Sequence, residues 1–150
     1  MLNLAESKGQ FEAGFPVKGG GFTDAGLVSG RIKTVLREKA LPENIIRRAA
    51  IVIFEAEINI ISYAEKGIIS CSTTPDLLII EAIDEGPGIV DIELALQEGY
   101  STADDIIREL GFGAGMGLSN IKRYSDEFEI SSEVGKGTRL KSIIKITWGI

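Results

Sequence analysis

The chain has 150 residues and a formal net charge of −6, with one cysteine and no histidine. This length fits one domain, 1–150, that buries a core without disulfide or metal staples. An acidic chain with no basic stripe is a poor ligand for DNA or RNA, and no apolar run reaches the ~20 residues of a membrane span. The missing histidine excludes Ser-His-Asp hydrolysis. We therefore expect a cytoplasmic protein that binds neither nucleic acid nor membrane, with a flexible leader over residues 1–9.

The first half of the chain begins with a strand and a surface helix. Weak apolar alternation predicts a strand over 10–18, and Pro16 favours a place at a sheet edge. Apolar residues at helical spacing predict an amphipathic helix over 25–39, with Thr23 or Asp24 as its N-cap. Four basic residues of this helix are expected to face solvent or an acidic partner: Arg31, Lys33, Arg37 and Lys39.

A second helix is predicted over 43–64, and it is apolar around almost its whole circumference. That pattern is typical of a central, buried helix. At about 100° per residue, Glu55 and Asn59 share one face, whereas Glu57 points nearly the opposite way. A carboxylate and an amide on a buried helix are costly unless neighbours satisfy them.

The second half of the chain is dominated by two predicted hairpins. The expected elements are strands over 68–73 and 77–83, a short helix over 91–98, a helix over 118–126, and strands over 127–133 and 138–148. Strands gather in hairpins and the helices lie between them. This order predicts an α+β fold, a two-layer α/β sandwich with a mixed, mostly antiparallel sheet and helices on one face.

Glycine clusters mark two candidate ligand sites. Gly113–Gly117 precedes a predicted helix, where backbone N–H groups can close around a phosphate because no Cβ blocks their approach. Asp84-x-Gly86-x-Gly88 follows a predicted strand, and its carboxylate can accept a hydrogen bond from an exocyclic amine such as that of adenine. Each cluster alone is weak evidence for a ligand site, because most such glycine-rich stretches are ordinary turns.

Glu55 and Asn59 also have two interpretations. The pair can be a polar seam that neighbouring backbone satisfies. It can instead serve divalent-metal chemistry, because an amide oxygen suits Mg²⁺ and a carboxylate can orient or deprotonate a nucleophile near a phosphate.

The order of these motifs is more specific than any one of them. A Glu-x-x-x-Asn helix (54–59), an Asp-x-Gly-x-Gly turn (84–89), a glycine-rich loop (111–118) and Gly-x-Gly-Thr (135–138) follow one another. The arrangement resembles the GHKL (HATPase_c) superfamily of ATP-binding domains, whose fold is the Bergerat fold. Within it, the chain is most similar to the stand-alone anti-sigma factor serine/threonine kinases.

The resemblance implies a role for each matching position. Glu55 would be the catalytic carboxylate, Asn59 would ligate Mg²⁺, and Asp84 would accept the adenine amine of ATP. Residues 99–117 would form a lid over the nucleotide, with Arg108 as its phosphate-facing cation. The other implied ATP-binding positions are Tyr63, Gly86, Gly88, Ile89 and Thr138 beside the adenine, and Gly113, Ala114, Gly115, Met116, Gly117 and Leu118 along the phosphates.

The function implied by this resemblance is a Mg-ATP-dependent regulatory protein kinase. Its expected partners are a small protein substrate of the anti-anti-sigma type and a sigma factor, and the resembling kinases are commonly homodimers. One alternative is an ATP-gated switch that sequesters a partner with little phosphoryl transfer. A plain ATP hydrolase is a third reading, disfavoured because family hydrolases couple the reaction through additional domains.

Overall fold

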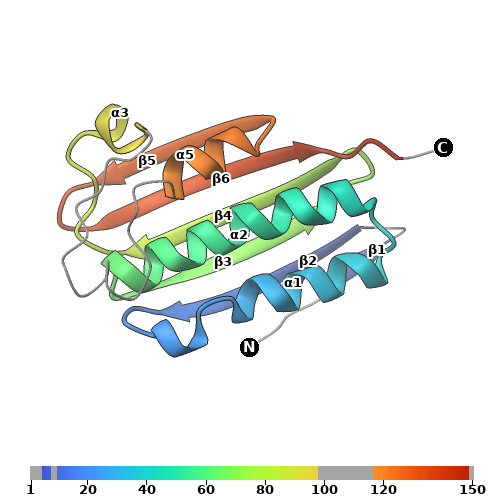
Figure 1. The fold of residues 1–150 in the computed structure, drawn as a ribbon, viewed down its shortest axis with the longest axis horizontal. Helices are drawn as coiled ribbons and strands as arrows, with labels where there is room; N and C mark the ends of the chain where they lie inside the picture. The colour runs from blue at the N-terminus through green and yellow to red at the C-terminus, as the bar shows by residue number, and fades with distance from the viewer. Residues whose placement is uncertain (1–4, 8–9, 98–116, 149–150) are drawn as a thin grey trace.

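The computed structural model describes residues 5–7, 10–97 and 117–148, which form a sheet with helices on one face (Figure 1). Its strands are β1 (Ala5–Ser7), β2 (Gln10–Lys18), β3 (Lys66–Thr73), β4 (Leu77–Glu85), β5 (Glu127–Glu133) and β6 (Gly137–Lys145). They make a six-stranded sheet in the order β1-β2-β3-β4-β6-β5, and each of these neighbouring pairs is antiparallel. The α+β sandwich expected from the sequence is confirmed.

The helices pack as a single layer on this sheet. They are η1 (Phe22–Asp24), α1 (Leu27–Glu38), α2 (Glu43–Tyr63), α3 (Ile92–Ala95) and α5 (Gly117–Arg123). The long helix α2 crosses the middle of the sheet, with α1 on one side of it and α5 on the other (Figure 1). No helix within the described parts of the chain is long and apolar enough to cross a membrane.

The N-terminal strand differs from the sequence expectation. Residues 5–7 form β1, which pairs with the first residues of β2 from Ser7↔Gln10 to Ala5↔Glu12, where the sequence predicts a flexible leader. The rest of β2 has no strand on that side within the described residues, and Pro16 lies in this unpaired stretch. A proline is tolerated there because it has no N–H to donate to a neighbouring strand.

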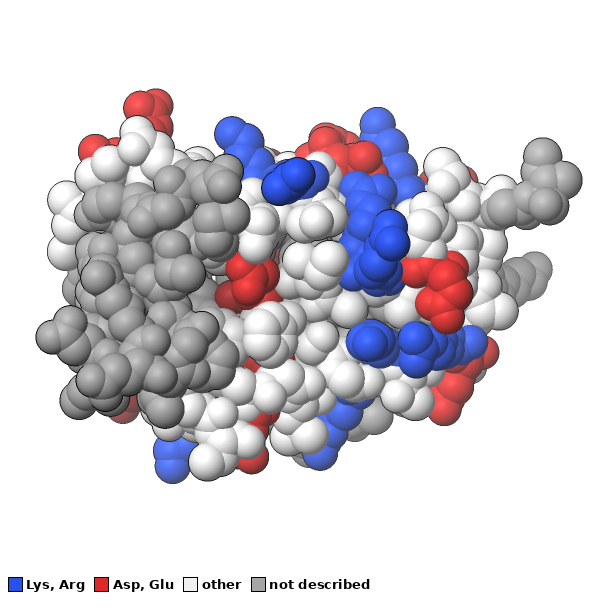
Figure 2. Space-filling view, viewed as in Figure 1, with Lys and Arg blue, Asp and Glu red and all other residues white. Residues whose placement is uncertain are grey.

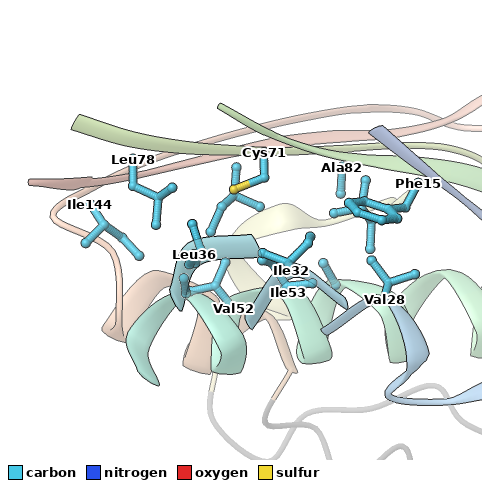
Figure 3. Close-up of a cluster of buried hydrophobic side chains, with 14 of the residues drawn as sticks. Phe15, Val28, Ile32, Leu36, Val52, Ile53, Cys71, Leu78, Ala82 and Ile144 are labelled. Atoms are coloured by element: carbon cyan, nitrogen blue, oxygen red, sulfur yellow. The ribbon is translucent and has the colours of Figure 1, made fainter. Parts of the chain in front are cut away.

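The core lies between α2 and the inner face of the sheet (Figure 3). Ile53 of α2 and Ile80 of β4 are completely buried, and each such side chain contributes roughly 1.5–3 kcal/mol by leaving water. Strand residues alternate between this core and the outer face, as period-two geometry requires. Burial raises the pKa of the Cys71 thiol to about 12, so this side chain acts as a small apolar residue.

The start of α1 is satisfied in a way that sequence analysis did not predict. Neither Thr23 nor Asp24 is its N-cap, because both residues belong to the preceding 3₁₀ turn. The N-cap is Gly26, which has φ 93° and no capping side chain. The Glu57 carboxylate of α2 accepts hydrogen bonds from the backbone N–H groups of the next two residues, Val28 at 3.2 Å and Ser29 at 3.4 Å. Glu57 is 2% exposed, and it joins the two helices.

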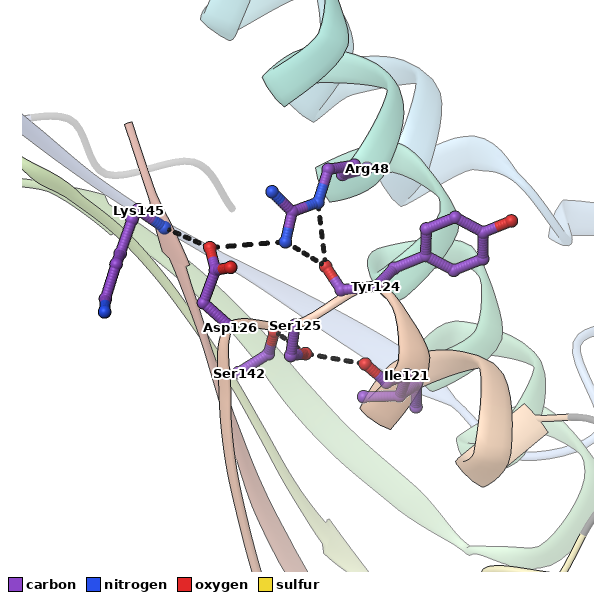
Figure 4. Close-up of polar contacts among 7 residues, drawn as sticks. All are labelled: Arg48, Ile121, Tyr124, Ser125, Asp126, Ser142 and Lys145. Carbon is purple, nitrogen blue, oxygen red and sulfur yellow. Dashed lines mark hydrogen bonds and ion pairs between the residues drawn. The ribbon is translucent and has the colours of Figure 1, made fainter. Parts of the chain in front are cut away.

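The far end of α5 is fixed to α2 and β6 by a polar network (Figure 4). The Arg48 guanidinium donates to the Tyr124 carbonyl from Nε at 3.1 Å and from the second terminal nitrogen at 3.0 Å. It also pairs with Asp126 at 3.2 Å, and the same carboxylate accepts from the backbone N–H of Lys145 at 2.7 Å. Helix α5 therefore has a fixed orientation against α2.

Candidate functional site

One face of α2 presents three polar side chains at intervals of four residues: Glu55, Asn59 and Tyr63. All three are half-buried, and their spacing places them along one line of the helix. Glu57 lies between the first two in sequence but caps α1 instead. The structure therefore separates the two carboxylates as their helical positions predict.

Glu55 faces the beginning of α5. Its Oε2 accepts a hydrogen bond from Asn120 Nδ2 at 3.1 Å. A Cβ placed on Gly117, the first residue of α5, would lie 3.9 Å from the same oxygen. Sequence analysis missed Asn120, because no motif marks it and its role depends on how α5 packs against α2.

Asp84 lies near the end of β4, half-buried beside β6. Its Oδ1 accepts a hydrogen bond from the backbone N–H of Thr138 at 3.2 Å. Burial raises the pKa of Asp84 above its usual 3.8, and the bond from Thr138 opposes that shift. Within the described residues the other carboxylate oxygen makes no hydrogen bond.

The loop after Asp84 fits closely between the end of α2 and the β5–β6 turn. A Cβ on Gly86 would lie 3.0 Å from Asp84 Oδ1 and 3.2 Å from the Cα of Ala64. Gly88 has φ 77°, and a Cβ there would come within 2.4 Å of the Glu133 carbonyl. Both glycines are required by close backbone approach, and at Gly88 also by the left-handed conformation.

A hydroxyl pair anchors this loop to the β5–β6 hairpin. The Ser132 hydroxyl accepts from the Ile89 N–H at 2.8 Å and donates to the Gly137 carbonyl at 3.0 Å. The Thr138 hydroxyl lies 2.8 Å from the Ser132 hydroxyl and donates to it, since the Ser132 proton is already engaged. Thr138 thus supports Asp84 through its backbone and the loop through its side chain. Sequence analysis missed Ser132, which looked like an ordinary strand residue.

Gly137→Ala is expected to lower the free energy of unfolding by roughly 2–3 kcal/mol, the upper range for single substitutions. Gly137 has φ 148°, and a new Cβ would lie within 2.0 Å of the Asp84 carbonyl oxygen. Urea denaturation measures the loss.

Gly135→Ala is the matched control, because Gly135 also has positive φ but has open space where its Cβ would be. Equal losses in the two variants would show that backbone conformation, and not contact with Asp84, constrains the hairpin.

These groups form a site with two chemically different ends. Asp84 and the Gly86–Gly88 loop make one end, beside the C-cap of α2, where a Cβ on Gly86 would lie 3.2 Å from Ala64. Glu55 and the start of α5 make the other, roughly 14 Å away along the helix axis at 1.5 Å per residue. The Gly113–Met116 cluster and Arg108 lie outside the described residues.

The polar groups at the two ends match the chemistry of an elongated ligand with an amine-bearing ring at one end and an anionic group at the other. Asp84 offers a hydrogen-bond acceptor beside the loop that Gly86 and Gly88 allow to approach the end of α2 and the β5–β6 turn. Asn59 offers an amide oxygen, the type of neutral ligand that Mg²⁺ accepts, one turn from the Glu55 carboxylate. An α+β sandwich with these two ends is the architecture of a nucleotide-binding domain.

Comparison with known proteins identifies the family. Residues 44–147 match the family of histidine kinase-, DNA gyrase B- and HSP90-like ATPases, and the chain belongs to that family. It is 38% identical to the serine/threonine-protein kinase RsbT of Bacillus subtilis over 100 residues, which cover 64% of this chain and 69% of the kinase.

Anti-sigma F factors are also similar. The factor from a Thermoanaerobacter species is 42% identical over 64 residues, or 43% of this chain and 41% of the factor. The one from Clostridium beijerinckii is 32% identical over 114 residues, or 73% of this chain and 65% of the factor. The chain thus spans from under half to about two thirds of these factors. The expected closeness to anti-sigma kinases is confirmed.

Proposed function

We propose that this protein is a Mg-ATP-dependent serine/threonine kinase that phosphorylates a small regulatory protein. The proposal rests on the two ends of the candidate site. One is the half-buried hydrogen-bond acceptor Asp84, and the other is the Glu55 carboxylate, which faces α5. Similarity to a serine/threonine-protein kinase and to anti-sigma F factors supports the reaction class. In this proposal the substrate is a protein of the anti-anti-sigma type, and a sigma factor is a second partner.

The nucleotide binds with its adenine at Asp84 and its phosphates toward α5. The second carboxylate oxygen of Asp84 accepts the adenine amine, and Gly86, Gly88 and Ile89 shape this end of the pocket, with Tyr63 and Thr138 beside it. At the other end, we expect the phosphates to accept hydrogen bonds from the backbone N–H groups of Gly117 and Leu118. The same role is proposed for Gly113, Ala114, Gly115 and Met116. Asn59 provides the protein's oxygen ligand to Mg²⁺, which when bound neutralises charge on the phosphates.

Glu55 acts on the hydroxyl of the protein substrate. It orients this hydroxyl and accepts its proton as the oxygen attacks the γ-phosphorus. The bond from that phosphorus to the bridging oxygen breaks, ADP leaves, and the phosphoryl group remains on the serine or threonine. Asn120 holds the carboxylate in place through its 3.1 Å hydrogen bond.

The test is an assay of the purified protein with Mg²⁺, γ-labelled ATP and candidate partner proteins. The proposal expects label on a serine or threonine of one partner. Release of labelled phosphate with no labelled protein would instead indicate a hydrolase. Partner binding that needs ATP but survives Glu55→Ala without transfer would indicate an ATP-gated switch.

Asn59→Ala is expected to weaken Mg-ATP binding by at least tenfold, because the variant loses the protein's oxygen ligand to the metal. A fluorescent ATP analogue titrated with and without Mg²⁺ measures this directly. The difference between wild type and variant should shrink when Mg²⁺ is removed. An unchanged affinity in the presence of Mg²⁺ would contradict the metal role.

A further inference from the structure

A groove of about 630 Å³ lies on the helical layer, outside the core. One wall comes from α1, where Lys33 and Arg37 follow one another at a spacing of four residues. The other wall comes from α2, which contributes Arg47 and a line of apolar side chains ending at Phe54. The groove also includes Glu55, so it reaches the carboxylate of the candidate site.

The groove is locally positive in an acidic protein. Figure 2 shows basic side chains gathered over the adjoining parts of α1 and α2. Arg37 pairs with Glu43 at 3.3 Å, but Lys33 and Arg47 have no ion pair with any described residue. The groove therefore places two cations, which have no ion pair among the described residues, beside an apolar floor in a chain whose net charge is −6.

We infer that this groove docks an acidic segment of the protein substrate and thereby delivers its hydroxyl to Glu55. The inference rests on the proposed function and specifies the partner. Arg47 precedes Glu55 by eight residues on one helix, roughly 12 Å along its axis. That distance corresponds to about four residues of extended chain at ~3.3 Å each. The acidic residues of the substrate therefore lie about four positions from the phosphorylated one.

The floor of the groove favours a protein segment over a nucleic acid. Ala50, Ile51 and Phe54 line it, and these side chains suit apolar residues that alternate with acidic ones. The α2 wall of the groove also has Glu43 and Glu55, and these carboxylates would repel a continuous row of phosphates. Nucleic-acid sites depend on many cations acting together, and the described lining of the groove has only Lys33, Arg37 and Arg47.

The experiment measures binding of a fluorescein-labelled ten-residue peptide of alternating glutamate and leucine to the full chain by anisotropy. The double variant Lys33→Glu with Arg47→Glu should bind it at least tenfold more weakly than wild type. Arg31→Glu with Lys122→Glu is the matched control, because both are exposed, neither lines the groove, and the net charge changes equally. All proteins are measured in 0.15 M salt, which screens the effect of net charge alone. Under these conditions the control should bind the peptide with an affinity within about twofold of wild type.

Other outcomes overturn the inference. They are equal affinity in the two double variants, no binding of the peptide to wild type, or tighter binding of labelled oligouridylate that the groove variant abolishes. A fluorescent ATP analogue is titrated in parallel. If wild type binds the ATP analogue but does not bind the peptide, only the docking groove is refuted. If wild type does not bind the ATP analogue at all, the proposed function is refuted.

Discussion

Glu55→Gln is expected to lower the rate of phosphoryl transfer to the partner by roughly 10²–10⁴-fold, the usual contribution of a general base. Glutamine keeps the size of the side chain and an oxygen that accepts from Asn120, so the fold and the position of α5 persist. What it loses is the capacity to accept the substrate proton. Initial rates of label transfer at saturating ATP measure the effect, and the affinity for ATP should stay within about threefold of wild type.

Glu129→Gln provides the control for that experiment. Glu129 is an exposed residue of β5, and its substitution by glutamine changes the net charge by the same amount as Glu55→Gln. Its transfer rate should match wild type. If Glu55→Gln transferred label as fast as this control, the proton acceptor would be another group. If ATP affinity and rate fell together, Glu55 would serve nucleotide binding and not the transfer step.

Glu57→Ala is expected to lower the free energy of unfolding by about 2–3 kcal/mol, because hydrogen bonds to charged groups contribute ~1.5–3 kcal/mol. The substitution leaves the N–H groups of Val28 and Ser29 without their acceptor at the start of α1. Urea denaturation measures the loss. The folded variant should bind ATP with nearly normal affinity, since Glu57 faces α1 and not the site, and a large loss of affinity would show that the wrong carboxylate was assigned.

Glu57 also predicts a pH dependence with a definite sign. Burial raises its pKa above the usual 4.5 and nearby Asp24 adds to the shift, while backbone N–H groups of Val28, Ser29 and Gly26 oppose it. A carboxyl with a raised pKa binds its proton more tightly in the folded state. Its contribution to stability is therefore full below pH 4.5 and is lost as pH rises through the folded pKa.

Denaturation of wild type and Glu57→Gln across that pH range isolates this contribution. The free energy of unfolding of wild type, minus that of the variant, should decrease as pH rises from 4.5. Asp84 also has a raised pKa, but it is present in both proteins and cancels from the difference. A difference that increased with pH would mean that the N–H donors outweigh burial at Glu57.

Most secondary structure was predictable because its signals are local. The strands Gln10–Lys18 and Glu127–Glu133 have the predicted bounds, and α2 ends one residue earlier than expected. The N-cap of α1 was not predictable, because its acceptor comes from α2 through tertiary packing and Thr23 and Asp24 were used in a 3₁₀ turn instead. The strand at residues 5–7, inside the expected leader, was not predictable for the same reason, since β1 exists through pairing with β2.

In the candidate site, too, features set by local spacing were predictable and features set by tertiary packing were not. Spacing alone placed Glu55 and Asn59 on one helix face and turned Glu57 away. Asn120 and Ser132 were missed because each acts on a residue far away in sequence, Glu55 and Ile89 respectively. Contacts of this kind depend on how α5 and the β5–β6 hairpin pack, which no local pattern encodes.

The pairing of β4 with β6 has a consequence for insertions in the chain. These two strands form adjacent rows of the sheet although the whole stretch from Gly86 to Lys136 separates them in the chain. Because this pairing fixes both ends of that stretch, insertions in the connections between α3, α5 and β5 have a small entropic cost, about 0.6 kcal/mol for each doubling of a flexible loop. An insertion in such a connection is therefore expected to leave the β4–β6 pairing, and the positions of Asp84 and Thr138, unchanged.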